Sequence, residues 1–218
     1  MMSNIFVGLD PSAGPSKPSG ICLLNETKQI VYIGRWNHQE DICEILTSVS
    51  GNPSIIGIDG PLKLPHELDL CCFSEPPSDC GHGQTTPYKG RYCEYLLIKR
   101  GYRCFLTSRN SFVKSWIKRC LELHDFLTGY SFKTIEVFPY ATRRILFPHI
   151  EGKKQSLHFR ENLLKTLIDW GIQFQEKTGQ YSHDELDAVL AAVTAKLHHQ
   201  NQTEMIGDAR DGYIIIPV

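Results

Sequence analysis

Five carboxylates stand at positions where they could act together: Asp10, Asp59, Glu136, Asp184 and Asp187. Asp10 and Asp59 each end a short apolar run, and Glu136 lies inside another, TIEVF. Asp184 and Asp187 are three residues apart, so they share one face of a helix. Carboxylates that converge repel one another and raise each other's pKa values. A hard cation such as Mg²⁺ or Mn²⁺ removes this repulsion, since it prefers oxygen ligands and suits phosphate esters.

The chemistry that this pattern predicts is metal-dependent hydrolysis of a phosphodiester. Two ions about 3.5–4 Å apart can activate a water and stabilise the leaving oxygen. Asp10, Asp59 and Asp187 are the expected Mg²⁺ or Mn²⁺ ligands. A simpler interpretation of Asp10 and Asp59 is structural, because Asp often ends a strand by hydrogen bonding to its own backbone. Glu136 in an apolar strand must be paired, neutralised or bound to a cation.

The helix that carries two of these acids is expected over residues 182–195, SHDELDAVLAAVTA. Ser182 and Glu185 have the spacing of a capping box, in which each side chain bonds the other residue's backbone N–H. Apolar residues continue at helical spacing, and alanines on the acidic face allow close packing against another element. The pattern therefore predicts a buried helix whose acidic start emerges at a rim.

The remaining elements follow from apolar runs and their breakers. Strands are expected at residues 4–10, 19–36 (a hairpin), 53–59, 102–108, 133–139 and 212–218. Further helices are expected at residues 39–50, 91–101, 110–127 and 154–171. Strands followed by alternating helices and strands indicate a mixed α/β layered fold. A length of 218 residues suits a single domain spanning 1–218.

Residues 65–90 form an excursion rich in Pro, Cys, Gly and Ser, without a regular period. Its cysteines and histidine suggest a zinc site whose ligands are Cys71, Cys80, His82 and Cys93. The adjacent Cys71 and Cys72 make the spacing irregular, so reduced thiols in an ordered loop are the alternative.

Charge is distributed unevenly along the chain. Nine basic residues and one acidic residue, Glu94, lie between Lys89 and Arg119, a local charge of +8 in a chain of net charge −1. Such a stretch can attract the phosphates of nucleic acid, or it can be the solvated face of two helices. Phe112 and Trp116 within it are expected in the core rather than as platforms for bases.

The bulk properties narrow the class of protein. The first residues lack the pattern of a signal peptide, and no run approaches the roughly 18 apolar residues of a membrane span. Eight cysteines without export signals indicate reduced thiols and a cytoplasmic protein.

The sequence resembles the domain-of-unknown-function family 429, whose members are described as predicted nucleases with an RNase H-like fold. The motifs that carry the resemblance are VGLDPSAGPSKPSGICLL, GIDGPLKLP, GRYCEYLLIKRG, TIEVFPYATRRIL, SHDELDAVLAAVTA and GDARDGYIIIP. The resemblance implies a mixed central sheet flanked by helices, with Asp10 on the first strand and Asp59 at the end of a later one. HDELDA is similar to the acidic helix of bacterial Holliday-junction resolvases, which implies catalytic roles for Asp184 and Asp187.

Basic residues in these motifs are expected to bind the substrate: Arg91, Arg143 and Arg144. Arg91 could instead form an exposed ion pair with Glu94. His183 could assist proton transfer or be a surface residue. The expected function is a nuclease acting on DNA or RNA. The alternatives are an actin-like nucleotide-binding phosphotransferase, for which DPSAGPSKPSG is a poor phosphate turn, and a non-catalytic nucleic-acid-binding module. Substrate type and oligomeric state stay open.

Overall fold

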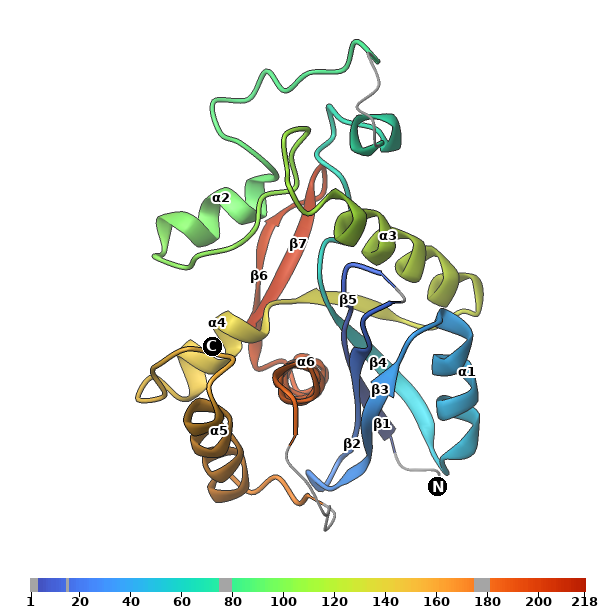
Figure 1. Cartoon of the computed structure of the whole chain (residues 1–218), viewed down its shortest axis with the longest axis vertical. Coiled ribbons are helices and arrows are strands. Elements are labelled where there is room, and N and C mark those ends of the chain that lie inside the picture. The colour runs from blue at the N-terminus through green and yellow to red at the C-terminus, as the bar shows by residue number, and fades with distance from the viewer. Residues whose placement is uncertain (1–3, 15, 75–79, 175–180) are drawn as a thin grey trace.

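A single mixed sheet organises the described chain. The computed structural model describes residues 4–14, 16–74, 80–174 and 181–218. Its strands are β1 Asn4–Asp10, β2 Ser19–Asn25, β3 Ile30–Trp36, β4 Asn52–Asp59, β5 Thr134–Val137, β6 Thr203–Asp208 and β7 Gly212–Pro217. They pair in the order β3-β2-β1-β4-β5-β7-β6 (Figure 1). β1 runs antiparallel to β2 and parallel to β4. The predicted mixed sheet is confirmed and is consistent with an RNase H-like fold.

Helices cover both faces of this sheet. They are α1 Gln39–Ser48, the 3₁₀ turn η1 Leu70–Phe73, α2 Tyr92–Lys99, α3 Lys114–Gly129, α4 Pro139–Leu146, α5 Leu157–Asp169 and α6 His183–His199. α6 lies between the strands β1–β3 and α5, whereas α1 lies on the other side of these strands (Figure 1). On the face of the sheet that carries α1, apolar strand residues pack against α1 and against the end of α3. The fold is therefore three layers deep around β1.

Alternation along β1 decides which face Asp10 occupies. Val7 and Leu9 belong to the core under α1 and α3. Successive strand residues point to opposite faces, so Gly8 and Asp10 point toward α6. The same alternation on β4 places Ile56 and Ile58 under α3 and Asp59 on the α6 face. The two aspartates thus emerge on one face, at the ends of neighbouring parallel strands.

α6 lies unusually close to the strands because glycines face it. A Cβ atom added at Gly8 would lie far inside van der Waals contact with the carbonyl oxygen of Ala188, and one at Gly20 would collide with that of Asp184. The expected alanine face of the helix is thus confirmed as a packing face. This approach brings the start of α6 beside Asp10.

Three elements differ from the expectations. The predicted strand at 102–108 is wrong, because these residues pair with no strand and Thr107 donates its N–H to the Glu94 carboxylate instead, at 2.9 Å. α4 was not expected; Pro139 ends the strand as predicted but also begins this helix, where its missing N–H costs nothing. β6 has too few apolar residues to predict a strand and is held by pairing with β7.

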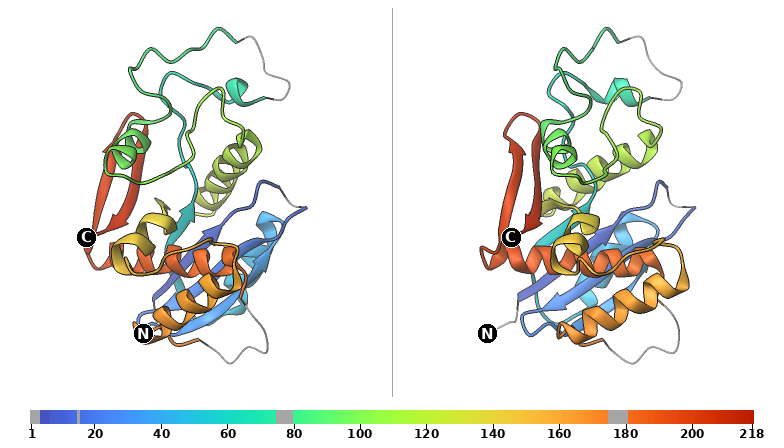
Figure 2. Two further views of the ribbon diagram at one scale, coloured as in Figure 1. Left: turned by 60° about the vertical axis from the view of Figure 1, so that its left-hand side comes forward. Right: turned by 90° about the vertical axis from the view of Figure 1, so that its left-hand side faces the viewer.

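The excursion extends beyond the sheet, as both views of Figure 2 show. Among its described residues, η1 is the one helical turn, and this turn packs on α3 through a cluster of apolar residues. The cluster comprises Leu68, Cys72, Phe73, Ile117 and Leu121. Within the described ranges, no helix is long and apolar enough to span a membrane.

Candidate metal centre

Three of the five predicted carboxylates meet at one edge of the sheet. Asp10, Asp59 and Asp187 each offer an oxygen, and these oxygens all lie within 4.8 Å of one another. Two of the acids end the parallel strands β1 and β4, whose carboxyl ends meet at the same edge. The third is one turn into α6, on the side that packs against β1. The sheet and the helix therefore assemble the cluster together.

Burial makes this cluster costly unless a cation is bound. Asp10 is 9% exposed and Asp187 is 8% exposed. The Oδ2 atom of Asp10 is buried and has no hydrogen-bond partner within the described part of the chain. Buried polar atoms without a partner are rare in native proteins and call for a specific explanation. An oxygen-preferring divalent cation fits this donor set.

The pKa values of two of these carboxyls indicate the same cost of burying negative charge. Burial, reinforced by the charges of Asp59 and Asp187, raises the pKa of Asp10 well above its usual range. Burial also raises the pKa of Asp59 to about 7, although Lys154 opposes this shift. The carboxyls of Asp10 and Asp59 are therefore held back from ionising by burial and by their acidic neighbours. A bound cation would reverse this effect.

Lys154 was not predicted as a site residue, yet its ammonium group pairs with the Asp187 carboxylate. Burial lowers the pKa of Lys154, but Asp187, Asp10 and Asp59 outweigh it, so the net shift is upward. Lys154 thus provides the positive charge at the centre. It lies in the connection between α4 and α5, where the sequence shows no motif that could have identified it.

A cavity of about 460 Å³ opens over the carboxylates. Its lining includes Phe105, Trp116, Phe138 and Tyr140 together with the basic Arg103 and Arg143. Phe105 also contacts Phe112 edge to face, with ring centroids 5.5 Å apart. The expectation that Phe112 lies in the core is wrong, since it is 84% exposed. The mouth of the cavity is therefore both aromatic and basic.

Asp184 lies at the rim rather than within the triad. His183 Nε2 is 3.0 Å from Asp184 Oδ1. Although burial opposes it, the hydrogen bond from His183 lowers the pKa of Asp184. The predicted capping box is confirmed, because Ser182 and Glu185 bond reciprocally. The pKa of Asp184 thus shifts in the opposite direction to the pKa values of Asp10 and Asp59.

Glu136 faces away from the triad and is paired with Arg91. Ile135 and Val137 pack under α6, so alternation sends Glu136 to the opposite face. Arg91 donates to both of its oxygens, at 2.7 and 2.5 Å, and the Leu62 N–H adds a third bond at 3.0 Å. Burial raises the pKa of Glu136, whereas Arg91 opposes the shift. Glu136 nevertheless lines the same cavity.

The three predicted substrate-binding arginines occupy different settings. Arg91 is 1% exposed and also donates Nε to Glu94 at 2.8 Å, so the predicted Arg91–Glu94 ion pair exists but is buried rather than exposed. Arg143 is 8% exposed, donates to the Ile150 carbonyl and lines the cavity. Arg144 is exposed and does not line it. Of the three, Arg143 is the one placed beside the carboxylates with no carboxylate partner among its recorded contacts.

The cysteine cluster of the excursion differs by one member from the expected set. Cys71, Cys72, Cys80 and His82 bring their sulfur and nitrogen atoms within 4.8 Å of one another. The inclusion of Cys93 was wrong, because Cys93 is buried on α2 against the β6–β7 hairpin. Cys72 takes its place in the cluster.

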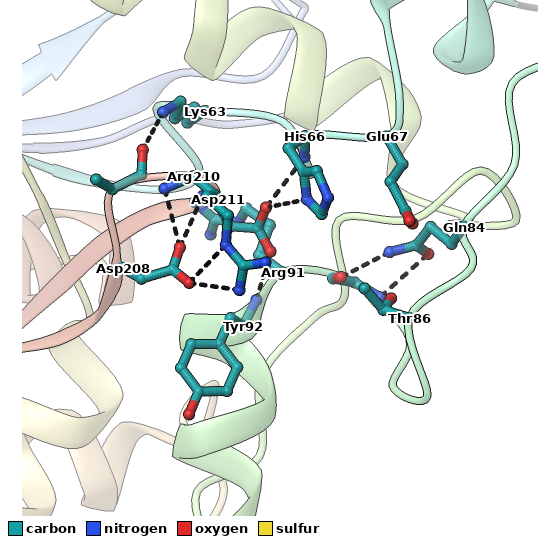
Figure 3. A network of polar contacts seen from close by, with 12 residues as sticks. Lys63, His66, Glu67, Gln84, Thr86, Arg91, Tyr92, Asp208, Arg210 and Asp211 are labelled. Carbon is teal, nitrogen blue, oxygen red and sulfur yellow. Dashed lines mark hydrogen bonds and ion pairs between the residues drawn. The ribbon is translucent and has the colours of Figure 1, made fainter.

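Asp211 anchors both ends of the excursion and was missed at the sequence level. Its Oδ1 accepts from the His66 N–H at 3.0 Å, and its Oδ2 accepts from the Tyr92 N–H at 3.0 Å (Figure 3). Lys63 adds a bond to the carbonyl of Ala209 in the same turn. Asp211 belongs to the GDARDGYIIIP motif, which was the available signal. The excursion thus begins and ends on the β6–β7 turn.

The described residues define an α/β protein with a carboxylate cluster that could hold a metal ion. The model of the family described as "Protein of unknown function (DUF429)" matches residues 8–211. The chain belongs to this family, as its motifs predict. No curated protein and no solved structure matches the chain. The function must therefore be argued from the site.

Proposed function

We propose that this protein is a metal-dependent nuclease that holds Mg²⁺ or Mn²⁺ between Asp10, Asp59 and Asp187. One observation carries the proposal: three carboxylates converge within 4.8 Å at a cavity, and one of them has a buried oxygen without a partner. When bound, the cation supplies Lewis-acid stabilisation of the phosphodiester and activates the attacking water.

The chain's own residues divide the remaining work. Asp10 and Asp187 are fixed by the strand and the helix, so their oxygens need little reorganisation on binding. Asp184 lies at the rim and pairs with His183, whose imidazole could assist proton transfer. With a cation held by Asp10, Asp59 and Asp187, the ammonium group of Lys154, which pairs with Asp187 in this structure, would be available to pair with a phosphate oxygen. Glu136 positions Arg91 instead of binding the cation.

The cavity mouth supports nucleic acid as the substrate. Phe105 and Trp116 contact one another with centroids 6.1 Å apart, and Phe112 extends this aromatic group into solvent. Bases without a paired partner stack on such side chains, and each stacked base contributes about 1–3 kcal/mol. Arg103 and Arg143 would meet the backbone phosphates. A strand with unpaired bases fits this surface best.

The test is cleavage of labelled single- and double-stranded DNA and RNA, a hybrid and a four-way junction, with Mg²⁺ or Mn²⁺. Asp10→Asn and Asp187→Asn should lose cleavage, as should the wild type in EDTA. The matched control is Asp125→Asn, an exposed acid on α3 that should cleave normally. Mn²⁺ binding by calorimetry should disappear in the first two variants.

Two results would contradict this proposal. If no substrate is cleaved although Mn²⁺ binds, the protein is a binding module or acts on nucleotides. If Asp10→Asn and Asp187→Asn cleave as well as Asp125→Asn, the carboxylate centre is not the site of hydrolysis.

A further inference from the structure

The tip of the excursion brings together four side chains that are separate from the carboxylate centre. Cys71 and Cys72 lie in η1, and Cys80 and His82 return to them from the other side of the excursion. The Cys71 sulfur is 3.4 Å from His82 Nδ1, and the Cys72 sulfur is 3.3 Å from the Cys80 sulfur. None of the eight cysteines, all within the described ranges, is in a disulfide. Four soft donor atoms therefore converge at one point.

The spacing of these atoms is close to that of a tetrahedral zinc site. Zn–S bonds of 2.3 Å and Zn–N bonds of 2.0–2.1 Å imply ligand separations of about 3.5–3.8 Å. Three cysteines and one histidine form a set that structural zinc uses. Thiolate ligands select zinc over Mg²⁺ and Mn²⁺, which prefer oxygen. The two sites on this chain therefore differ in the kind of ion they favour.

The residues around the cluster provide a positive charge and an apolar packing surface for a bound zinc site. Three thiolates and Zn²⁺ leave one negative charge, and the Arg109 guanidinium lies beside the cluster, donating to the His82 carbonyl at 2.6 Å. Cys72 is 1% exposed and packs with Phe73 against Ile117 of α3. The cluster is thus attached to the helix that also carries Trp116, a residue of the cavity wall.

We propose that Cys71, Cys72, Cys80 and His82 bind one structural Zn²⁺ ion, which fixes the excursion against α3. Binding replaces the thiol protons, so up to three protons go to solvent and no electron transfer is involved. The ion serves an excursion in which η1 is the one helical turn among the described residues. This proposal does not depend on nuclease activity, because zinc content is measured without a substrate.

The test is the metal content of the full chain purified under reducing conditions without chelators. Elemental analysis should find about one zinc per chain in the wild type, and Cys71→Ser and Cys80→Ser should lose most of it. Cys43→Ser changes a half-buried thiol on α1 and should retain the zinc. Cobalt reconstitution should give the absorption bands of a tetrahedral thiolate site in the wild type and in Cys43→Ser, but not in Cys71→Ser or Cys80→Ser.

A second variant separates ligand loss from misfolding. His82→Cys keeps four donors, so it should retain zinc and shift the cobalt spectrum toward that of four thiolates. A wild-type chain without zinc or cobalt bands would overturn the proposal, as would a Cys72–Cys80 disulfide found in its place. Zinc retained by both Cys71→Ser and Cys80→Ser would overturn it as well.

Discussion

Lys154 is a single residue that competes with the proposed cation. Its ammonium group pairs with the Asp187 carboxylate, one of the three proposed ligands, so a cation bound there would have to displace it. We expect Lys154→Met to bind Mn²⁺ more tightly than the wild type, by roughly tenfold or 1.4 kcal/mol, while cleavage falls. Calorimetry would measure the affinity, with Lys153→Met, an exposed neighbour, as the control. Unchanged or weaker Mn²⁺ binding in Lys154→Met would mean that the lysine does not occupy the cation's place.

Glu136 can be assigned to structure or to metal binding by one substitution. Because Arg91 is buried between Glu136 and Glu94, Glu136→Gln should lower the free energy of unfolding by about 3 kcal/mol. Mn²⁺ affinity should stay at the wild-type value. Urea denaturation and calorimetry would give both quantities, with the exposed Glu161→Gln as a reference. The reverse outcome, lost affinity with full stability, would make Glu136 a ligand.

Among the elements, the contact between β1 and α6 sets the geometry of the acids. Gly8→Ala would force its new methyl group into the Ala188 carbonyl, so the helix must move away from the strand. We expect a loss of about 1–3 kcal/mol in the free energy of unfolding, together with weaker Mn²⁺ binding. Gly129→Ala, where no atom lies within 4 Å of the added Cβ, should leave both nearly unchanged. Full Mn²⁺ affinity in Gly8→Ala would show that the acids tolerate a displaced helix.

Sequence patterns predict the elements well where burial repeats regularly. The run ending at Asp10 gives a strand and the alanine-rich run gives the helix α6, as expected, and they bring Asp10 and Asp187 together, whereas Asp184 lies outside the triad. Residues 102–108 have the composition of a strand, but they pair with no strand, and the Thr107 N–H bonds the Glu94 carboxylate instead. Pairing is a tertiary property that the local sequence does not decide. The alternation of residues along β5 could have predicted that Glu136 lies on the face of the sheet away from Asp59, because its neighbours Ile135 and Val137 share the other face.

The composition of the two clusters was harder to predict. Cys93 lies close to Cys80 in the sequence, but α2 turns it into the core, and only the three-dimensional path brings Cys72 into its place. Lys154 is the first residue of the helix expected at residues 154–171, but the observed helix α5 begins at Leu157 and leaves Lys154 in the connection. The ion-pair partner of a long side chain in a loop depends on which charged groups lie nearby, and these groups come from elements distant in the sequence.

For the whole molecule, the buried acids predict an unusual dependence of stability on pH. The pKa of Asp59 is near 3.9 in an unfolded chain and rises to about 7 on folding, so the folded state binds this proton more tightly. The free energy of unfolding therefore falls as the pH rises through this interval. In EDTA, we expect a lower Tm at pH 8 than at pH 5.5.

Two additions make this expectation specific to the carboxylate centre. Mn²⁺ should restore the Tm at pH 8, since it binds the ionised carboxylates. Asp59→Asn should reduce the pH dependence in EDTA, whereas Asp125→Asn should not. A wild-type Tm that rises toward pH 8 without metal would show that these acids ionise freely in the folded protein.

Asp211 has a consequence for the connectivity of the chain. Because one carboxylate accepts the backbone N–H groups of both His66 and Tyr92, each end of the excursion has its own anchor on the β6–β7 turn. We therefore expect the two ends to stay together when the polypeptide between them is cut. New chain termini could be placed there, with the original ends joined by a linker, and the order of the strands in the sheet would be preserved.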